Sequence, residues 1–489
     1  MTDEGAETVV RRDRFSGGPA RGFMSSLAAD ERIFAADLAV DRAHVLMLAE
    51  QEIIDDDEAA EILGALDAVE TAGHGALPDG EDVHEAIESA VIDRIGPVGG
   101  KMHTARSRND EVAACLRYQL REDLLSAIEA TIALRESLLE TAAEHLDTTM
   151  PGYTHLQPAQ PITVAHFLCS YEATIARDTA RLRDAYDRTN QSPLGAAAFA
   201  GTPFDIDRER TAELLGFDGV MRNSMDAAAA RDFLAEVTAA LAAHATTLSG
   251  LAEDLIVYSN KGFLELSDAY SSTSSIMPQK KNPDTMELTR GVAGDAIGSV
   301  TGVLSTLKGL PRAYNRDLQR AHGHAFEAID VVTEASAVAA GAVSTANWDS
   351  EALAAAAGEG FSTATGIADL LAMAGIPFRT AHELVAHAAE AAETQPEGVT
   401  AANLDAAAEA VLGESLFEHV TEAAIEEALD PAASVASRDS VGGPAPTAVD
   451  ATIEAATADV DAHTAAVADR RSALETAADM LDTEVLDRV

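Results

Sequence analysis

Lysine is scarce in this sequence. Only five occur among 489 residues, and the other basic side chains are arginines. With 82 acidic against 34 basic residues, the formal net charge is -48. A surface of this charge repels phosphate groups, so neither nucleic acid nor an anionic membrane is expected as a partner. The acidic residues are interspersed with apolar residues at helical spacing, which favours a globular, salt-adapted protein over a disordered chain.

Cysteines, aromatic residues and long apolar runs are also few. The two cysteines, Cys115 and Cys169, form no CxxC pair and give no sign of a disulfide framework or a zinc site. No stretch of 18 uncharged apolar residues could span a membrane. No apolar run follows the arginines near the N-terminus, so no signal peptide is expected and the cytoplasm is the expected compartment.

Gly and Pro divide the chain into a predicted arm (1–22), a small N-terminal domain (23–109), a central bundle (110–347) and a small helical C-terminal domain (348–489). The first bundle helix, at about 38 residues, would be about 57 Å long at 1.5 Å per residue. Long, alanine-rich helices have more apolar surface than one chain covers easily, so association between copies is expected. Long helices are predicted at 110–150, 162–191, 226–258, 284–308 and 317–346.

One polar segment, DAYSSTSSIMPQKKNPDTME at 268–287, combines five adjacent hydroxyl side chains with two of the five lysines. Pro278 and Pro283 prevent a continuous helix, and Asp284 and Glu287 then suit the first turn of a new one. A solvated surface loop is the alternative interpretation. The scarcity of lysine elsewhere favours a functional loop.

Two further segments carry candidate chemistry. GGKMHTARSRNDE at 99–111 gathers basic side chains just before a predicted helix, where backbone amides and guanidinium groups can bind an anion. Pairing of these arginines with the abundant carboxylates is the alternative. PGYTHLQPAQP at 151–161 holds His155 in a proline-rich turn, although a lone histidine is more often structural than catalytic.

The 268–287 loop resembles the signature loop of the fumarase/aspartase superfamily, Gly-Ser-Ser-x-x-Pro-x-Lys-x-Asn, and MPQKKNPD is similar to the argininosuccinate lyase family in particular. The stretches RSRND, YTHLQPAQP, RNSMDAAAARDF and LPRAYNRDLQ match the same family. Three positions depart from its pattern: Thr273 and Ala105 replace glycines, and His322 replaces a lysine. The last change puts one substrate-carboxylate contact in doubt, because histidine is largely neutral at pH 7.

The resemblance implies a mainly α, three-domain fold whose central long-helix bundle forms a shared core in a homotetramer, with each active site built from three subunits. It implies β-elimination of argininosuccinate to arginine and fumarate, the last step of arginine biosynthesis, with no cofactor and no metal. The implied catalytic residues are Ser274, His155, Glu287, Lys280 and Asn282. The implied substrate-binding residues are Ser26, Ser107, Arg108, Asn109, Thr154, Tyr314, Gln319 and His322.

Several questions stay open at this stage. Either Ser274 or His155 could be the base of the pair, and Arg231 with Asp232 could be a structural ion pair or a support of the site. Adenylosuccinate lyase and aspartase share the same Ser and His, although RSRND and YNRDLQ favour argininosuccinate. A crystallin-like structural role is the alternative of a different class, and the presence of Ser274, His155 and Lys280 argues against it.

Overall fold

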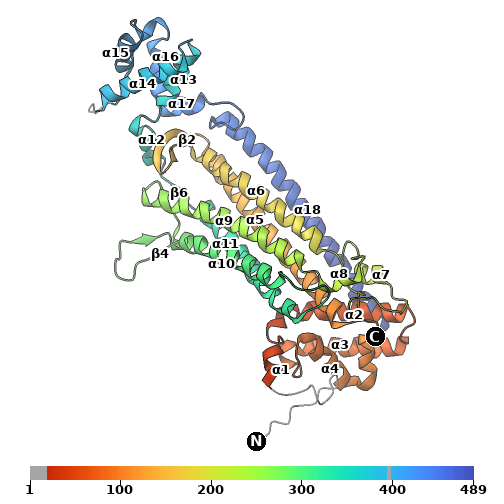
Figure 1. The fold of residues 1–489 in the computed structure, drawn as a ribbon. Helices are drawn as coiled ribbons and strands as arrows, with labels where there is room; N and C mark the ends of the chain where they lie inside the picture. The colour runs from red at the N-terminus through yellow and green to blue at the C-terminus, as the bar shows by residue number, and fades with distance from the viewer. Residues whose placement is uncertain (1–18, 394–397) are drawn as a thin grey trace.

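The computed structural model describes residues 19–393 and 398–489, which form an elongated molecule (Figure 1). Long helices make up its middle, with the N-terminal helices at one end and a group of short helices at the other. Only three two-stranded sheets occur among these residues, so the mainly α prediction is confirmed.

The five predicted long helices are all present, and the first of them packs against the second and the fifth. Three of their ends differ from the prediction. The first helix stops at Glu144 because Thr149–Thr154 forms a strand, while residues 224–229 and 316–320 form separate short helices before the third and fifth. The bounds are α5 Arg108–Glu144, α6 Val164–Thr189, α9 Asp232–Asn260, α10 Asp284–Leu307 and α11 His322–Ser344.

The N-terminal domain packs around a helix that is buried on nearly all sides, α2 Phe34–Glu50. Residues 1–18 of the predicted arm lie outside the described residues, and its last four residues belong to a short helix. The other elements are α1 Pro19–Met24, α3 Asp56–Ala72, α4 Val83–Ile95 and the 3-10 segment η4 Gly96–His103.

The short helices at the opposite end enclose a separate hydrophobic core, which includes Ile367, Leu384, Leu404 and Ile425. They follow the strand β6 Asn347–Trp348, which pairs with β3 Leu264–Glu265. The helices that form this core are α13 Ala364–Met373, α14 Phe378–Ala392, α15 Ala401–Val411 and α16 Glu422–Leu429. Two more short helices, α12 Ser350–Ala357 and α17 Pro431–Ala436, pack against residues 149–163.

The last helix, α18 Pro446–Arg488, corrects the predicted C-terminal domain at 348–489. It runs back along α5 and α6 to the N-terminal end of the molecule, and its buried side chains, such as Val460 and Leu474, join the large core of the bundle (Figure 1). The buried Arg135 of α5 helps to hold it, donating to Glu172 Oε1 and to Asp459 Oδ2 on α18, both at 2.8 Å. Residues 446–488 therefore pack as a sixth long helix of the bundle.

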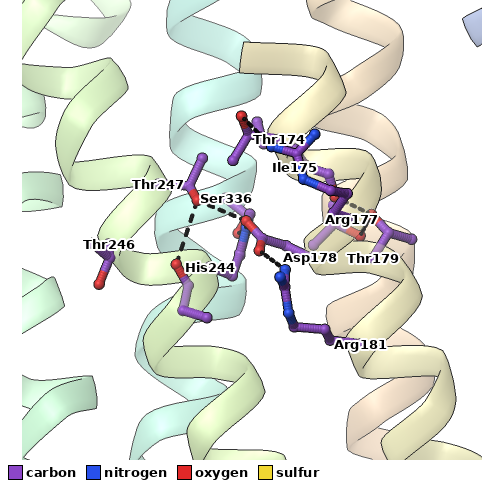
Figure 2. A network of polar contacts seen from close by, with 12 residues as sticks. Thr174, Ile175, Arg177, Asp178, Thr179, Arg181, His244, Thr246, Thr247 and Ser336 are labelled. Carbon is purple, nitrogen blue, oxygen red and sulfur yellow. Dashed lines mark hydrogen bonds and ion pairs between the residues drawn. The ribbon is translucent and has the colours of Figure 1, made fainter. Parts of the chain in front are cut away.

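A polar network crosses the interior of the bundle between α6, α9 and α11 (Figure 2). Asp178 Oδ2 accepts a hydrogen bond from Thr247 Oγ1 at 2.7 Å and lies 3.5 Å from His244 Nδ1. His244 Nε2 in turn lies 2.9 Å from Ser336 Oγ. Because a slip of one helix would leave these buried polar groups unpaired, the network favours a single register of the three helices.

Two short hairpins complete the fold. The strands β1 Thr149–Thr154 and β2 Gln157–Thr163 pair beyond the end of α5, and β4 Ser272–Thr273 pairs with β5 Lys281–Asn282 before α10. In the described ranges, no helix has the length and apolar character needed to cross a membrane.

Candidate active site

A pocket of about 210 Å³ lies where the start of α5 meets the N-terminal domain. It brings together residues that are up to 296 positions apart in the sequence, because α5, α11 and the N-terminal domain converge there. Six of the predicted substrate-binding residues line it: Ser26, Arg108, Asn109, Tyr314, Gln319 and His322.

The N-terminus of α5 sets the positions of Arg108 and Asn109. Ser107 caps the helix and accepts from the backbone N–H of Asn109 at 3.3 Å, while Asp110 Oδ1 accepts from the backbone N–H of Ser107 at 3.0 Å. Asp110 Oδ2 also accepts from two backbone amides of the 195–197 segment, both at 2.9 Å. This reciprocal capping fixes the first turn of α5 against a neighbouring loop. Ser107 is used in the cap, whereas Arg108 and Asn109 face the pocket.

Two other polar side chains of the pocket, Ser26 and Gln319, are held by hydrogen bonds. Ser26 Oγ donates to Asp30 Oδ2 at 2.7 Å, and Gln319 Nε2 donates to the carbonyl oxygen of Met24 at 3.1 Å. Burial raises the pKa of Asp30. Arg108 lies 3.4 Å from Asp82. Carboxylates and guanidinium groups therefore both line the pocket, which suits a ligand carrying both signs of charge.

The other basic residues of the 99–111 segment do not form the predicted anion site. Arg106 is buried between Asp41 and Glu111, with N–O distances of 2.5 and 2.9 Å. Lys101 forms an ion pair with Glu58 on the surface of the N-terminal domain. The alternative interpretation, pairing with carboxylates, is therefore correct for these two residues, because α2 and α3 place acidic side chains beside them.

Arg231 is a pocket residue that the predicted site omits. Its side chain is 2% exposed and lines the pocket beside Tyr314, and its Nε and Nη2 have no hydrogen-bond partner. Burial and the charge of Arg117 lower the pKa of Arg231 to about 10, so it remains a cation at pH 7. The matching stretch RNSMDAAAARDF pointed to it, but only the fold shows that it faces the pocket.

His322, which stands where the family has lysine, carries no charge here. Burial lowers the pKa of His322 to about 4, and the positive charge of Arg231 acts in the same direction. The pocket therefore lacks a cation at this position and has one in Arg231.

The two other departures have different backbone consequences. Ala105 has a φ of 62°, in the left-handed region that a glycine enters without strain. Thr273 lies on β4 and pairs with Lys281, in extended backbone that suits a β-branched residue. The replacement of glycine is therefore strained at Ala105 and compatible with the structure at Thr273.

Thr154 and His155 lie at the tip of the β1–β2 hairpin, and both are exposed. The hairpin follows the C-terminal end of α5, whereas Arg108 begins that helix. With 37 residues, α5 is about 55 Å long at 1.5 Å per residue. One chain therefore places Thr154 and His155 far from the pocket.

Ser274 occupies a loop between β4 and β5, on the side of the bundle that is remote from the N-terminal domain (Figure 1). Its Oγ accepts from the backbone N–H groups of Ile276 and Met277 at 3.3 and 3.0 Å. Lys280 is exposed in the same loop, whereas Lys281 pairs with Glu265 and Asp268. The loop thus presents a hydroxyl oxygen that already receives two amide hydrogens.

The remaining predicted residues flank this loop. Asn282 lies on β5 and Glu287 lies exposed in the first turn of α10. Within the described parts of the chain, no hydrogen bond or ion pair joins Glu287 to His155. The predicted residues thus form three separate groups in one chain: the pocket, the tip of the β1–β2 hairpin, and the 272–287 segment.

Comparison with known sequences decides the family. A family model described as Lyase matches residues 21–298, and one described as Argininosuccinate lyase C-terminal matches residues 361–436. Argininosuccinate lyase of Natronomonas pharaonis is 71% identical over 98% of this chain and 96% of its own length. That of Haloarcula marismortui is 65% identical over 99% of this chain and 97% of its own. The chain belongs to the argininosuccinate lyase family.

Solved structures of argininosuccinate lyase's wider superfamily share the fold. EDDS lyase in complex with formate is 36% identical with a TM-score of 0.86, covering 96% of both chains. A class II fumarase from Schistosoma mansoni is similar in fold alone, with 16% identity and a TM-score of 0.69 over 82% of this chain and 90% of that chain. The argininosuccinate lyase matches favour this family over adenylosuccinate lyase, aspartase and a crystallin-like role.

Proposed function

We propose that this chain cleaves argininosuccinate to arginine and fumarate by β-elimination. The observation that carries this proposal is the identity of 71% with a named argininosuccinate lyase over 98% of the chain. The reaction removes a proton from the carbon beside a carboxylate, breaks the bond between carbon and the guanidinium nitrogen, and returns a proton to that nitrogen. The protein must therefore supply a base, an acid and groups that bind the carboxylates.

Ser274 is the proposed base. A serine hydroxyl has a high intrinsic pKa, so it acts as a base only where positive charge or hydrogen-bond donors stabilise the alkoxide. The amide hydrogens of Ile276 and Met277 already point at its Oγ. Lys280 and Asn282, on the same hairpin, are proposed to complete this stabilisation when the loop closes over the substrate.

His155 is the proposed acid, acting on the leaving nitrogen directly or through water, with Glu287 orienting the ring. The reverse assignment, with His155 as the base, uses the same pair of residues. Because Glu287 and His155 are not in contact within one chain, we propose that they meet across a subunit boundary.

The pocket is proposed to bind the substrate. Ser107, Arg108, Asn109 and Thr154 would hold the succinyl carboxylates, with Ser107 contributing through the cap of α5 as well. Ser26, Tyr314 and Gln319 would hold the arginine end, and the neutral His322 could offer a hydrogen bond but no charge. Arg231 adds the cation that His322 does not supply.

The separation of the three groups supports a homotetramer with shared active sites. The pocket lies at the start of α5, and the hairpin lies beyond its other end, so a second subunit running in the opposite direction could bring them together. The exposed face of α10 supports such packing, because Leu288, Ile297 and Leu304 are 71%, 52% and 52% exposed in the single chain. A cytoplasmic location stays a prediction.

The test is the ultraviolet absorbance of fumarate after mixing purified protein with argininosuccinate, in molar salt and in dilute buffer. We expect fumarate in molar salt and its loss on dilution, because the repulsion between 82 acidic side chains is screened only at high ionic strength. If no fumarate appears in either buffer, the proposed reaction is wrong. Adenylosuccinate and aspartate would then be the next substrates.

A further inference from the structure

Aromatic side chains make up 4% of the sequence, yet five of them gather beneath the β1–β2 hairpin. Tyr258 lies at the centre of this aromatic cluster, with its ring centroid 5.1 Å from Phe167 and 6.2 Å from both Tyr153 and Trp348. The ring of Phe263 lies 6.4 Å from that of Tyr258. Edge-to-face and tilted rings at these separations attract one another beyond the apolar area that they bury. The aromatic cluster therefore forms a rigid support for the β1–β2 hairpin.

The tip of the hairpin has a strained backbone. Thr154 pairs with Gln157, and the two residues between them, His155 and Leu156, have φ values of 56° and 57°. Positive φ at both central residues is typical of a type I′ turn, where Asn and Gly are favoured because other side chains clash with the backbone. Leu156 is 67% exposed, so its own packing does not offset this strain. Such conformations persist where the surrounding structure enforces them.

Tyr153 connects the strained turn to the aromatic cluster. It precedes His155 by two residues on β1, and its half-buried ring contacts Tyr258 on one side. The ammonium nitrogen of Lys261 lies 4.7 Å from the centroid of the same ring. Tyr153, Tyr258 and His155 also line one cavity of about 480 Å³. Tyr153 is therefore the aromatic residue through which the cluster can restrain the backbone of the turn.

Gly152, which precedes Tyr153, further restricts the backbone conformation of the hairpin. Gly152 approaches β2 so closely that a Cβ atom there would lie 2.6 Å from the carbonyl oxygen of Gln160. Gly152 is held close to β2 and the ring of Tyr153 is held in the aromatic cluster. The backbone that leads into the turn is therefore fixed in one orientation.

We propose that Tyr153 is a positioning residue for His155, and that its anchored ring keeps His155 and Leu156 in the left-handed conformation that sets the direction of the imidazole. The proposal rests on the acid or base role proposed for His155. Tyr153 itself does not touch the reacting atoms. When the anchor is removed, the turn relaxes to an unstrained backbone conformation and the imidazole changes direction.

The test compares Tyr153→Leu, which removes the ring, with Tyr153→Phe, which keeps it. We expect kcat for Tyr153→Leu to fall about tenfold to a hundredfold, as small displacements of a catalytic group cause, while KM changes less than about threefold. Tyr153→Phe should keep kcat within about threefold of the wild type, since the ring and not the hydroxyl contacts Tyr258. If Tyr153→Leu does not assemble, Tyr153→Met fills most of the space without a ring and replaces it.

A second measurement does not depend on activity. Hydrogen–deuterium exchange of residues 150–163 should become faster in Tyr153→Leu and unchanged in Tyr153→Phe, with the rest of the bundle unaffected. An assembled Tyr153→Leu protein with wild-type kcat and wild-type exchange would overturn the proposal. Faster exchange with unchanged kcat would also overturn it, because the anchor would then hold the hairpin without orienting His155. If the wild type makes no fumarate, the proposed function fails, and unchanged exchange in Tyr153→Leu would still refute the anchor.

Discussion

At the scale of single residues, burial neutralises one basic side chain of the pocket and leaves another one charged. His322 and Arg231 lie in the same wall, and burial lowers the pKa of both. An imidazole with a pKa of about 4 is neutral at pH 7, whereas a guanidinium with a pKa of about 10 is still protonated. Arg231 therefore supplies a cation near the position where the sequence pattern alone shows a missing lysine.

Arg231→Gln tests the role of this cation. We expect the variant to fold and assemble, and its KM for argininosuccinate to rise at least about tenfold, because an ionic hydrogen bond to a substrate carboxylate contributes about 1.5–3 kcal/mol. Steady-state kinetics would measure the change, with Arg379→Gln on the exposed face of α14 as the matched control. An unchanged KM in Arg231→Gln would show that substrate does not contact this guanidinium.

Ser274→Ala tests the proposed base. The variant should assemble normally and lose at least about a thousandfold in kcat, within the range that general acid–base groups contribute. Ser275→Ala, one residue along the same exposed loop, is the control and should keep most of the activity. Turnover like that of the wild type in Ser274→Ala would remove this serine from the mechanism.

Sequence patterns could predict six residues of the pocket but not its whole lining, from which they missed Arg231. Arg108 and Asn109 were predicted as binding residues, and both line the pocket. Arg106, from the same basic stretch, forms buried ion pairs instead. The difference depends on Asp41, which is 65 residues away in the sequence, so spacing along the chain could not reveal it.

At the scale of elements, uninterrupted helical sequence predicted well where it was applied. Such stretches predicted the five helices of the central bundle. The stretch after Pro446 is also uninterrupted, but the predicted C-terminal domain includes it. That stretch has no Gly and no further Pro for 43 residues, and it forms α18. The β1–β2 hairpin could not be predicted in this way, because its pairing depends on a turn with positive φ at His155 and Leu156, which are not residues that favour such turns.

The contact between α2 and the loop before α5 should make stability depend on pH. His44 on α2 is buried, and its Nε2 lies 2.8 Å from the carbonyl oxygen of Thr104. Burial and the charge of Arg106 lower the pKa of His44 to about 3, below the ordinary value of 6.5. Between these values the unfolded chain binds a proton that the native protein does not, so His44 makes the native state less stable as pH falls.

His44→Gln removes this titration and can keep a donor for Thr104. Between pH 6.5 and 4, we expect the free energy of unfolding to fall less steeply in His44→Gln than in the wild type. Denaturant titrations at a series of pH values in molar salt would measure the slopes, with His382→Gln on the exposed face of α14 as the control. Equal slopes in His44→Gln and the wild type would mean that His44 is not held neutral by its surroundings.

At the scale of the whole molecule, the length of the bundle separates the predicted catalytic and binding groups. The pocket contains Arg108 at the start of α5, and the hairpin that carries His155 follows the end of that helix, about 55 Å away for its 37 residues. A rigid helix of this length cannot fold back to join the two. We therefore propose that an active site takes its pocket and its His155 from different subunits.

A mixture of two inactive variants tests this sharing of the active site between subunits. His155→Asn and Arg108→Gln would be purified separately, mixed under conditions that allow subunits to exchange, and assayed by fumarate absorbance. The mixture should regain up to about a quarter of the wild-type activity, because some sites then combine an intact pocket with an intact His155 from another subunit. Activity no higher than that of the separate variants, with subunit exchange demonstrated, would contradict the shared site.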